Sequence, residues 1–159
     1  MRKRLMLFAG LPALLAGCNQ NTAIGNDREA QLDPPAEAAA IEPASNALQG
    51  VATTLVKPET MSDADIAAIG GDRGRCVFRL TEVGFPTFVY QPDGSGIIKL
   101  NGKLIPVEPD GTDRFTSGEL LVTTRMLDDE GNAGLQALRL IVVPPGAKDE
   151  LGFDGYTTC

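Results

Sequence analysis

The side chains able to carry out covalent or acid–base chemistry are few, and they form no familiar catalytic pattern. The sequence contains no histidine, which removes imidazole-based acid–base catalysis, histidine-activated nucleophiles and imidazole zinc ligands. It also contains no Ser-x-x-Lys or Cys-x-x-Cys motif, and no glycine-rich loop leading from a strand into a helix. We therefore predict a protein that is not an enzyme and holds no cofactor or metal. A hydrolase using two of its 21 acidic residues remains an alternative.

The first of three cysteines follows a segment typical of an exported protein. Residues 2–4 are Arg-Lys-Arg, and an apolar stretch of about 13 residues follows them, shorter than the roughly 20 residues that a membrane-spanning helix needs. Pro12 and the leading cations argue against the alternative, a buried N-terminal helix. The stretch ends in Leu15-Ala16-Gly17-Cys18, which resembles the lipobox of bacterial lipoproteins at all four positions. The resemblance implies a signal peptide of residues 1–17 and fatty acylation, such as palmitate, on Cys18.

The lipobox resemblance also implies a location and a state for the other two cysteines. Two or three acyl chains give stable membrane anchoring, and Asn19, where inner-membrane lipoproteins carry aspartate, favours the periplasmic face of the outer membrane. With Cys18 acylated, Cys76 and Cys159 remain as a pair. The periplasm is oxidising, so we expect a disulfide between them, with two free thiols as the alternative.

Charge is distributed unevenly along the sequence. Without residues 2–4, the chain has 11 basic against 21 acidic residues, a net charge of about −10. Such a polyanion is not expected to bind nucleic acid or anionic headgroups, so the membrane would be reached only through the lipid on Cys18. A basic envelope or host protein would be attracted. The alternative is that the charge serves only solubility.

The region after Cys18 changes in composition at about residue 58. Residues 19–58 are rich in Ala, Asn, Gln, Glu and Pro and contain no aromatic residue, so we expect residues 18–58 to form a lipidated, disordered tether. A segment that folds onto a partner is the alternative. The folded domain is then predicted over residues 59–159. It begins with a helix of two turns, capped by Ser62 and Asp65, packed by Ile66 and Ile69 and ended by two glycines.

The rest of the domain shows alternating apolar residues separated by turns. The clearest element is the hairpin around Asn101-Gly102, a pair that favours a type I′ turn. That turn places Lys99 opposite Leu104 and puts four apolar residues on one face, namely Ile98, Leu100, Ile105 and Val107. Other strands are predicted at residues 76–81, 87–90, 119–127 and 135–143, and a loop-rich tail from residue 144. We therefore predict a mainly β domain of five or six antiparallel strands, a meander sheet or a partly closed barrel or sandwich.

Two loops offer possible sites. Residues 128–132, Asp-Asp-Glu-Gly-Asn, have oxygen ligands for Ca²⁺ but lack EF-hand spacing, so an acidic hairpin loop is the favoured interpretation. Phe153 and Tyr156 form either a recognition loop or a cover over the open end of the sheet. Neither loop predicts a reaction.

Two family resemblances concern the C-terminal region. Residues 70–159 resemble an uncharacterised family of small bacterial lipoproteins and secreted proteins, through Cys76-Val-Phe, residues 96–104 and Lys148-Asp-Glu-Leu-Gly. Ser117-Gly118 also resembles part of the Ser-Gly-x-x-Tyr motif of membrane-bound inhibitors of c-type lysozyme, although Leu121 stands where tyrosine is expected and their second motif is missing. We therefore expect an envelope lipoprotein with a non-enzymatic binding or structural domain. Inhibition of a lysozyme-type hydrolase is the first alternative and a hydrolase the second.

Overall fold

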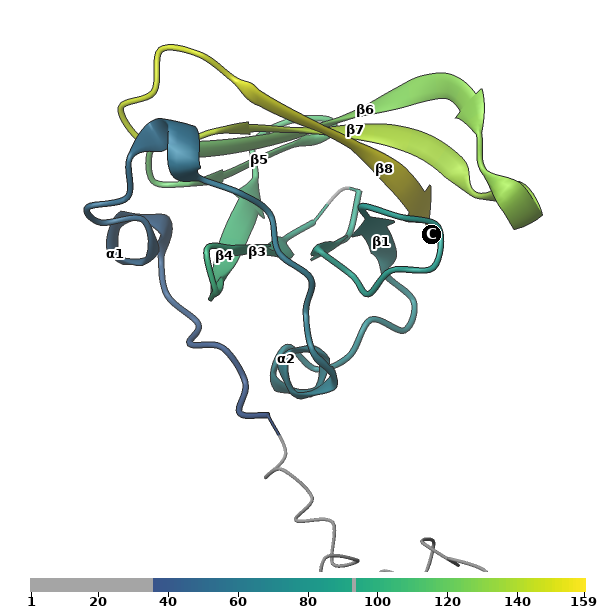
Figure 1. The fold of residues 1–159 in the computed structure, drawn as a ribbon, viewed down its shortest axis with the longest axis horizontal. Coiled ribbons are helices and arrows are strands. Elements are labelled where there is room, and N and C mark those ends of the chain that lie inside the picture. Colours follow the sequence, from purple (N-terminus) through teal and green to yellow (C-terminus); the bar gives the residue numbers. More distant parts are fainter. Residues whose placement is uncertain (1–35, 93) are drawn as a thin grey trace, which may run out of the picture. The chain divides into compact units, whose positions relative to one another are not determined.

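The computed structural model describes residues 36–92 and 94–159 and shows a closed antiparallel barrel of eight strands in chain order (Figure 1). The predicted fold class is confirmed, although the strands number eight rather than five or six. The strands are β1 (Cys76–Arg79), β2 (Phe88–Tyr90), β3 (Gly96–Leu100), β4 (Lys103–Pro109), β5 (Arg114–Ser117), β6 (Leu120–Glu130), β7 (Gln136–Val143) and β8 (Leu151–Thr158). The helices are α1 (Ala44–Ala47), α2 (Asp63–Ala68) and the short 3-10 turns η2 (Thr53–Leu55) and η3 (Asn132–Gly134). Within the described residues, no helix has the length and apolar character that crossing a membrane requires.

The β3–β4 hairpin has the predicted register. Lys99 pairs with Leu104 and Ile98 with Ile105. Asn101 and Gly102 have φ values of 46° and 75°, as a type I′ turn requires. The four apolar residues predicted on one face all point into the barrel and are fully buried.

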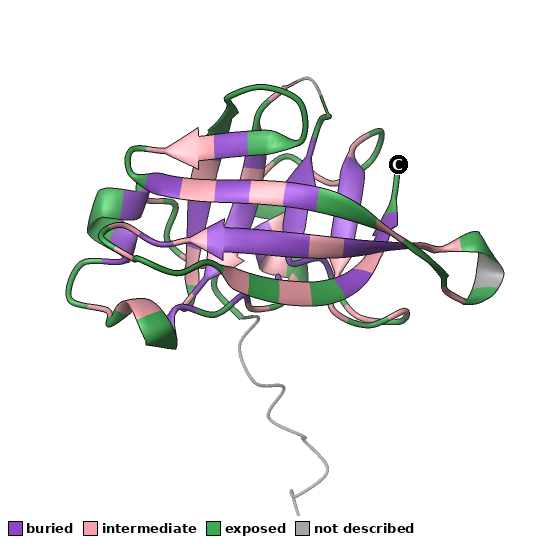
Figure 2. Cartoon of the chain, turned by 90° about the horizontal axis from the view of Figure 1, so that it is seen from above, coloured by how far each residue is buried: buried purple, intermediate pink, exposed green. Residues whose placement is uncertain are grey.

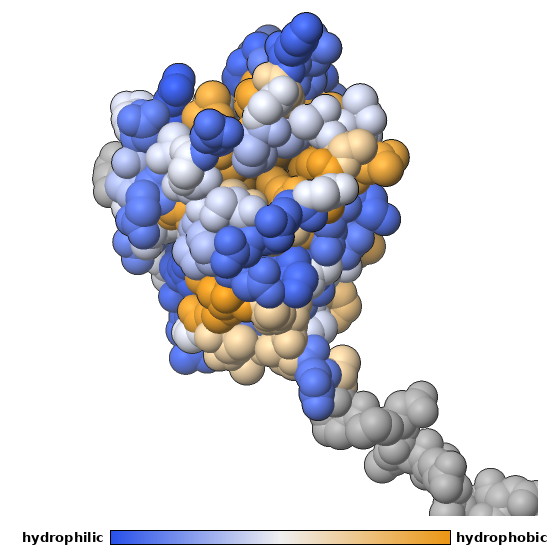
Figure 3. All heavy atoms as spheres, turned by 90° about the vertical axis from the view of Figure 1, so that its left-hand side faces the viewer, coloured by the Kyte–Doolittle hydropathy of each residue, from blue (hydrophilic) through white to orange (hydrophobic). Residues whose placement is uncertain are grey.

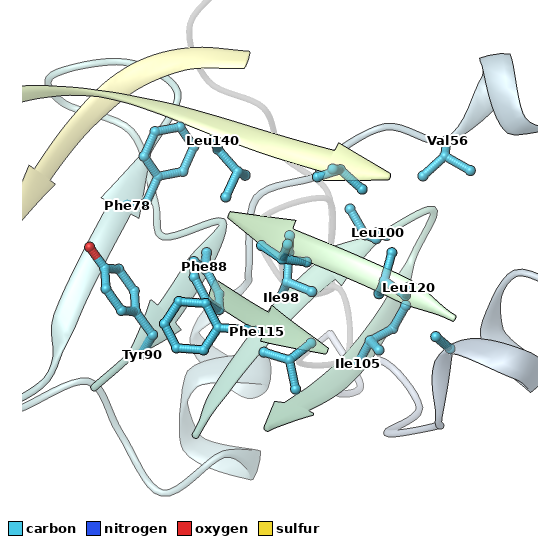
Figure 4. Close-up of a cluster of buried hydrophobic side chains, with 14 of the residues drawn as sticks. Val56, Phe78, Phe88, Tyr90, Ile98, Leu100, Ile105, Phe115, Leu120 and Leu140 are labelled. Atoms are coloured by element: carbon cyan, nitrogen blue, oxygen red, sulfur yellow. The ribbon is translucent and has the colours of Figure 1, made fainter. Parts of the chain in front are cut away.

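The barrel interior is filled by aromatic and aliphatic side chains (Figure 4). Phe88 stacks on Tyr90 with ring centroids 4.6 Å apart, and Phe115 meets Phe88 edge-on at 5.2 Å. Buried and partly exposed positions alternate along the strands (Figure 2), as expected for strands with one face in a core. The sparse aromatics of this sequence are therefore concentrated in its core.

A disulfide supports the seam that closes the barrel. β1 and β8 share only three paired positions, from Val77 opposite Thr158 to Arg79 opposite Tyr156. One position beyond, Cys76 and Cys159 form the expected bond, with Cα atoms 3.9 Å apart. The covalent link therefore adds one position to the short pairing that closes the barrel.

The predicted tether is wrong over its second half, because residues 39–58 pack on the barrel. Ala44, Leu48 and Val56 are 0%, 7% and 3% exposed and belong to the core. Ile41 forms a parallel bridge with Leu104, where the backbone N–H of Glu42 donates to the Leu104 carbonyl at 2.9 Å. The domain thus begins well before residue 59. Cys18 and residues 19–35 lie outside the described residues.

Helix α2 forms as predicted and covers an outer face of the barrel. Ser62 and Asp65 form the capping box, and Ile66 and Ile69 pack over β2–β4. Asp65 is 1% exposed and accepts hydrogen bonds from Lys99 Nζ at 2.6 Å and from the N–H of Ala39 at 2.6 Å. Met61, Val89 and Leu104 are buried beneath this cover although they lie outside the barrel.

The loop-rich tail expected from residue 144 is wrong, because it contains β8. This strand pairs with β7 over seven positions and with β1 at the seam. Gly155 faces the ring of Phe78, and a Cβ there would lie 2.7 Å from ring atoms. The close contact with Phe78 therefore requires glycine at position 155, although glycine has a low strand propensity. The sequence pattern does not show this contact. The short β5 was also not predicted.

Candidate binding site on an acidic hairpin

A ligand site inside the barrel is not supported by the packing. Phe78, Phe88, Phe115, Leu100 and Leu140 are fully buried and fill the interior. The hollows formed by described residues are lined by loops and outer faces instead. We therefore place the candidate binding site on the surface.

The β6–β7 hairpin extends beyond the barrel wall (Figure 1) and carries acidic residues at its end. Asp128, Asp129 and Glu130 are all exposed. Within the described part of the chain, none of the three forms an ion pair. These residues confirm the predicted acidic hairpin and give it a concentrated negative charge.

A bulge sets the acidic residues apart from the regular ladder. Pairing between β6 and β7 shifts between Met126 and Glu130. The side-chain amide of Gln136 donates to the carbonyls of Leu127 and Asp129, at 3.3 and 3.4 Å. A bulge increases the local twist of a strand. Here the Gln136 amide donates to two backbone carbonyls in the part of β6 where regular pairing with β7 is interrupted.

The end of the hairpin is held against the rest of the domain. Glu82, in the β1–β2 loop, accepts hydrogen bonds from the Asn132 side chain at 2.7 Å and from its backbone N–H at 3.1 Å. These two bonds, the side-chain bond first, lower the pKa of Glu82. Gly131 lies against the ring of Tyr156, where a Cβ would be 2.6 Å from a ring carbon. The hairpin is thus a positioned element that adds a fourth carboxylate, Glu82, to the acidic group.

A hollow of about 220 Å³ lies at the base of the hairpin. Leu80, Leu127 and Ala137 contribute apolar walls, and Asp129 and Tyr156 contribute polar groups. Such a hollow next to exposed carboxylates can receive the aliphatic stem of a lysine or arginine while the charged end meets an acid.

Of the two arginines near the hairpin base, only Arg139 forms an ion pair among the described residues. Arg125 lies directly opposite Arg139 on the outer face of β6 and β7. Asp154 of β8 accepts from Arg139, with Nη2 and Oδ2 2.6 Å apart. This hydrogen bond lowers the pKa of Asp154 and raises that of Arg139. The pair offsets the repulsion between the two arginines, and the acidic end of the hairpin remains without a cation of its own among the described residues.

Ser117 and Gly118 lie at a second hollow, of about 560 Å³, between β4, β5 and residues 41–43. The Ser117 hydroxyl accepts from the backbone N–H of Ala44 at 3.3 Å, at the start of α1. Gly118 forms the tight β5–β6 turn with φ 60°. On the side of the domain that carries α1, hydrophobic and hydrophilic residues are interspersed (Figure 3). Ser117 thus supports the N-terminal segment and does not project from the surface.

Two further features bear on metal binding and on buried polar groups in the described residues. No group of three or more acidic or cysteine side chains there is arranged to hold a metal ion. The Thr87 hydroxyl is the single buried side-chain polar atom in this part of the chain without a partner, and it lies among core residues. Cys76 and Cys159 are joined in a disulfide at the seam between β1 and β8.

The sequence identified only part of this surface. Residues 128–132 were recognisable as an acidic hairpin segment because four polar residues and a glycine follow an apolar run, although β6 extends to Glu130. Glu82 was not recognisable, since its role depends on Asn132, 50 residues away in the chain. Tyr156 was expected to cover the sheet end, and instead it supports the hairpin through Gly131.

Comparison with known proteins provides a family. The family described as a domain of unknown function, DUF6692, matches residues 14–159, which is most of the chain. No curated protein and no solved structure matches this chain.

Proposed function

We propose that this chain, which belongs to the DUF6692 family, is a lipoprotein of the bacterial cell envelope whose barrel binds a basic protein through its acidic hairpin. The protein would be anchored by lipid on Cys18 to the periplasmic face of the outer membrane, and it would act without catalysis. The observation that carries the binding proposal is the exposed, unpaired acidic end of a hairpin that Glu82 and Tyr156 hold in position.

The anchor is supported by the N-terminal sequence. Residues 2–4 are basic, the following stretch is apolar, and Leu15-Ala16-Gly17-Cys18 matches the lipobox. The family match begins at residue 14 and so includes these four residues. Labelling of cells with a fatty-acid analogue should mark the native protein and not a Cys18→Ala variant; equal labelling of both would exclude lipidation at Cys18.

The binding proposal is supported by the charge of the chain and its local concentration. Asp128, Asp129 and Glu130 are consecutive at the end of the hairpin, and Glu82 bonds to Asn132 in the turn that follows. Long-range attraction of this kind raises association rates with oppositely charged proteins and is screened by salt. At 1 M salt the screening length falls to about 3 Å, so binding should be nearly abolished.

The test uses a soluble Cys18→Ser protein from residue 18 onward and a c-type lysozyme as a basic probe. Association would be measured by surface plasmon resonance over a range of salt concentrations. The variant D128N/D129N/E130Q should weaken binding at least about tenfold, which corresponds to about 1.4 kcal/mol. The matched control E37Q/E119Q/E150Q neutralises three other exposed carboxylates and changes the net charge equally. Equal weakening by both variants would show that total charge acts without a hairpin site.

The same mixture distinguishes the inhibitor alternative. A projecting hairpin is a suitable shape for entering an enzyme cleft, and this feature favours inhibition as a second candidate. A cell-wall lysis assay would reveal it as a loss of lysozyme activity that D128N/D129N/E130Q relieves. Relief by Ser117→Ala alone would instead favour a site at the β5–β6 turn. Binding without loss of lysis would support a binding module that is not an inhibitor.

A further inference from the structure

We propose that the tip of the β1–β2 loop, Val83–Phe85, contacts the surface of the bilayer that holds the lipid anchor. The inference rests on the proposed lipidation of Cys18. It adds a second, non-covalent membrane contact that would orient the barrel, and it commits to the phospholipid interface as the partner of this loop.

The loop presents apolar side chains to solvent. Val83 is 97% exposed and Phe85 56% exposed. A single exposed apolar residue is ordinary, but two at one loop tip beside a shared hollow are less so. That hollow has a volume of about 360 Å³, and Ile66 of α2 also lines it.

The exposure is built into the loop. The Gly84 N–H donates to the Thr81 carbonyl at 3.2 Å and the Met61 N–H donates to the Pro86 carbonyl at 2.7 Å. The backbone N–H of Thr87 then donates to the carbonyl of Phe78 at 2.9 Å. Both ends of the loop are thereby fixed to the domain, and the apolar tip is held outward between them.

The anchored end of the chain reaches the domain beside this loop. The N–H of Ala39 bonds to Asp65 of α2 at 2.6 Å, and α2 lines the hollow together with the loop. About 20 residues lie between Cys18 and Ala39. Even a fully extended chain of that length spans at most about 75 Å. The bilayer is therefore kept within reach of the surface around α2.

The charges near the loop indicate how the contact would work. Asp63, Asp72 and Arg79 line the hollow, and the exposed Glu82 directly precedes Val83, so the surface there is acidic overall. Attraction to anionic headgroups is thus not the source of binding. Insertion of Val83 and Phe85 into the interface would supply it, and this contact would orient a domain that the acyl chains already hold at the membrane.

The experiment places a fluorescent label at the loop in the lipidated protein. With Cys18 acylated and Cys76 bonded to Cys159, a Val83→Cys variant has one free thiol, which can carry an environment-sensitive dye. The protein would be reconstituted into phosphatidylcholine vesicles containing a lipid that quenches the dye. We expect a blue-shifted, strongly quenched dye at residue 83. The matched control is Leu55→Cys. Leu55 is also an exposed apolar residue, but it does not line the hollow beside the loop, so a dye at residue 55 should remain in water.

A second variant tests the apolar contact itself. Phe85→Ser in the labelled Val83→Cys protein should reduce quenching severalfold, whereas Leu55→Ser should leave it unchanged. Adding phosphatidylglycerol should not increase quenching. An unquenched dye at residue 83 on vesicles that retain the protein would overturn the proposal. So would a blue shift that depends on protein concentration without vesicles, because that outcome indicates a second copy of the chain. A mass spectrum showing no acyl group on Cys18 would instead contradict the proposed anchor.

Discussion

The barrel carries an acid–base pair on each of two outer faces, and the two pairs differ in burial. Over β2–β4, Asp65 and Lys99 are 1% and 14% exposed in their side chains, 2.6 Å apart, beneath the N-terminal segment. Over β7–β8, Arg139 and Asp154 are 37% and 54% exposed. The first face is covered by α2 and the segment before it, whereas the second meets solvent directly.

This difference shows that part of the outer surface of the barrel is apolar and is buried by segments outside the barrel. Leu104 and Val89 point outward from the strands and are still fully buried, because Met61 and Ile66 cover them. The face of β6–β8 has no such cover, and charged residues occupy it. The covered face therefore stabilises the domain, while the uncovered face and the hairpin above it remain available for binding.

The largest effect should come from removing the cover. A chain that starts at residue 59 lacks α1 and the buried Leu48 and Val56. Loss of their burial should cost about 5 kcal/mol, which is comparable to the whole stability of many domains. Urea denaturation of chains starting at residues 36 and 59 would measure the difference.

The control for this truncation is a chain that starts at residue 19. It should unfold at the same urea concentration as the chain starting at residue 36, if residues 19–35 contribute little. Equal stability of the chains starting at residues 36 and 59 would contradict the assignment of residues 39–58 to the core.

The contrast between the two faces also explains which features the sequence could predict. The Asn101-Gly102 hairpin and the Ser62–Asp65 capping box depend on residues within a few positions of each other, and both were predicted correctly. The packing of residues 39–58 depends on distant strands. Leu48 and Val56 lie in a stretch of mixed Ala, Thr, Gln and Gly residues, and no periodic pattern marks them.

The same reasoning applies to the binding surface and to β8. The acidic residues of the hairpin are adjacent in the sequence, whereas Glu82 and Tyr156 reach the hairpin only in the folded chain. In β8, Gly152 and Gly155 reduce strand propensity, and the strand forms because β7 and β1 pair with it from both sides.

The second largest effect should come from opening the seam. Cys76 and Cys159 are 83 positions apart, and a loop of that length is stabilised by about 4 kcal/mol in the chain-entropy model. The variant C76A/C159A should lose up to this amount in urea denaturation. The unmutated chain that starts at residue 36, which contains only Cys76 and Cys159, should show no free thiol on alkylation. Alkylation of both cysteines without reductant would exclude the bond.

The third prediction compares the two faces of β8 through its glycines. Gly155 points inward, where a Cβ would lie 2.7 Å from the ring of Phe78 and closer still to the Arg79 carbonyl. Gly155→Ala should therefore cost about 3 kcal/mol through overpacking. Gly152 lies on the solvent side, 3.6 Å from Arg139 Cδ, which is an ordinary contact. Gly152→Ala should change stability little, and equal loss in both variants would contradict the inward placement of Gly155.

The smallest effect concerns the two ion pairs themselves. Burial alone would raise the pKa of Asp65, but hydrogen bonds from Lys99, Ala39 and Ser62 outweigh it and lower the pKa from 3.8 to about 2. Because the folded state binds this proton less readily than the unfolded state, the pair stabilises the fold above about pH 4. That contribution, about 2 kcal/mol, should be lost as the pH falls from about 4 to about 2.

Asp65→Asn should therefore cost about 2 kcal/mol at pH 7, because it leaves the mostly buried Lys99 without its carboxylate. Asp154→Asn removes the same kind of partner from Arg139, but solvent can replace the contact on the exposed face. Urea denaturation at pH 7 and at low pH would compare both variants with the parent. The difference between Asp65→Asn and the parent should shrink on acidification, since the parent then loses the same interaction. A constant difference across that range would mean that Asp65 acts through its packing and hydrogen bonds and not through its charge.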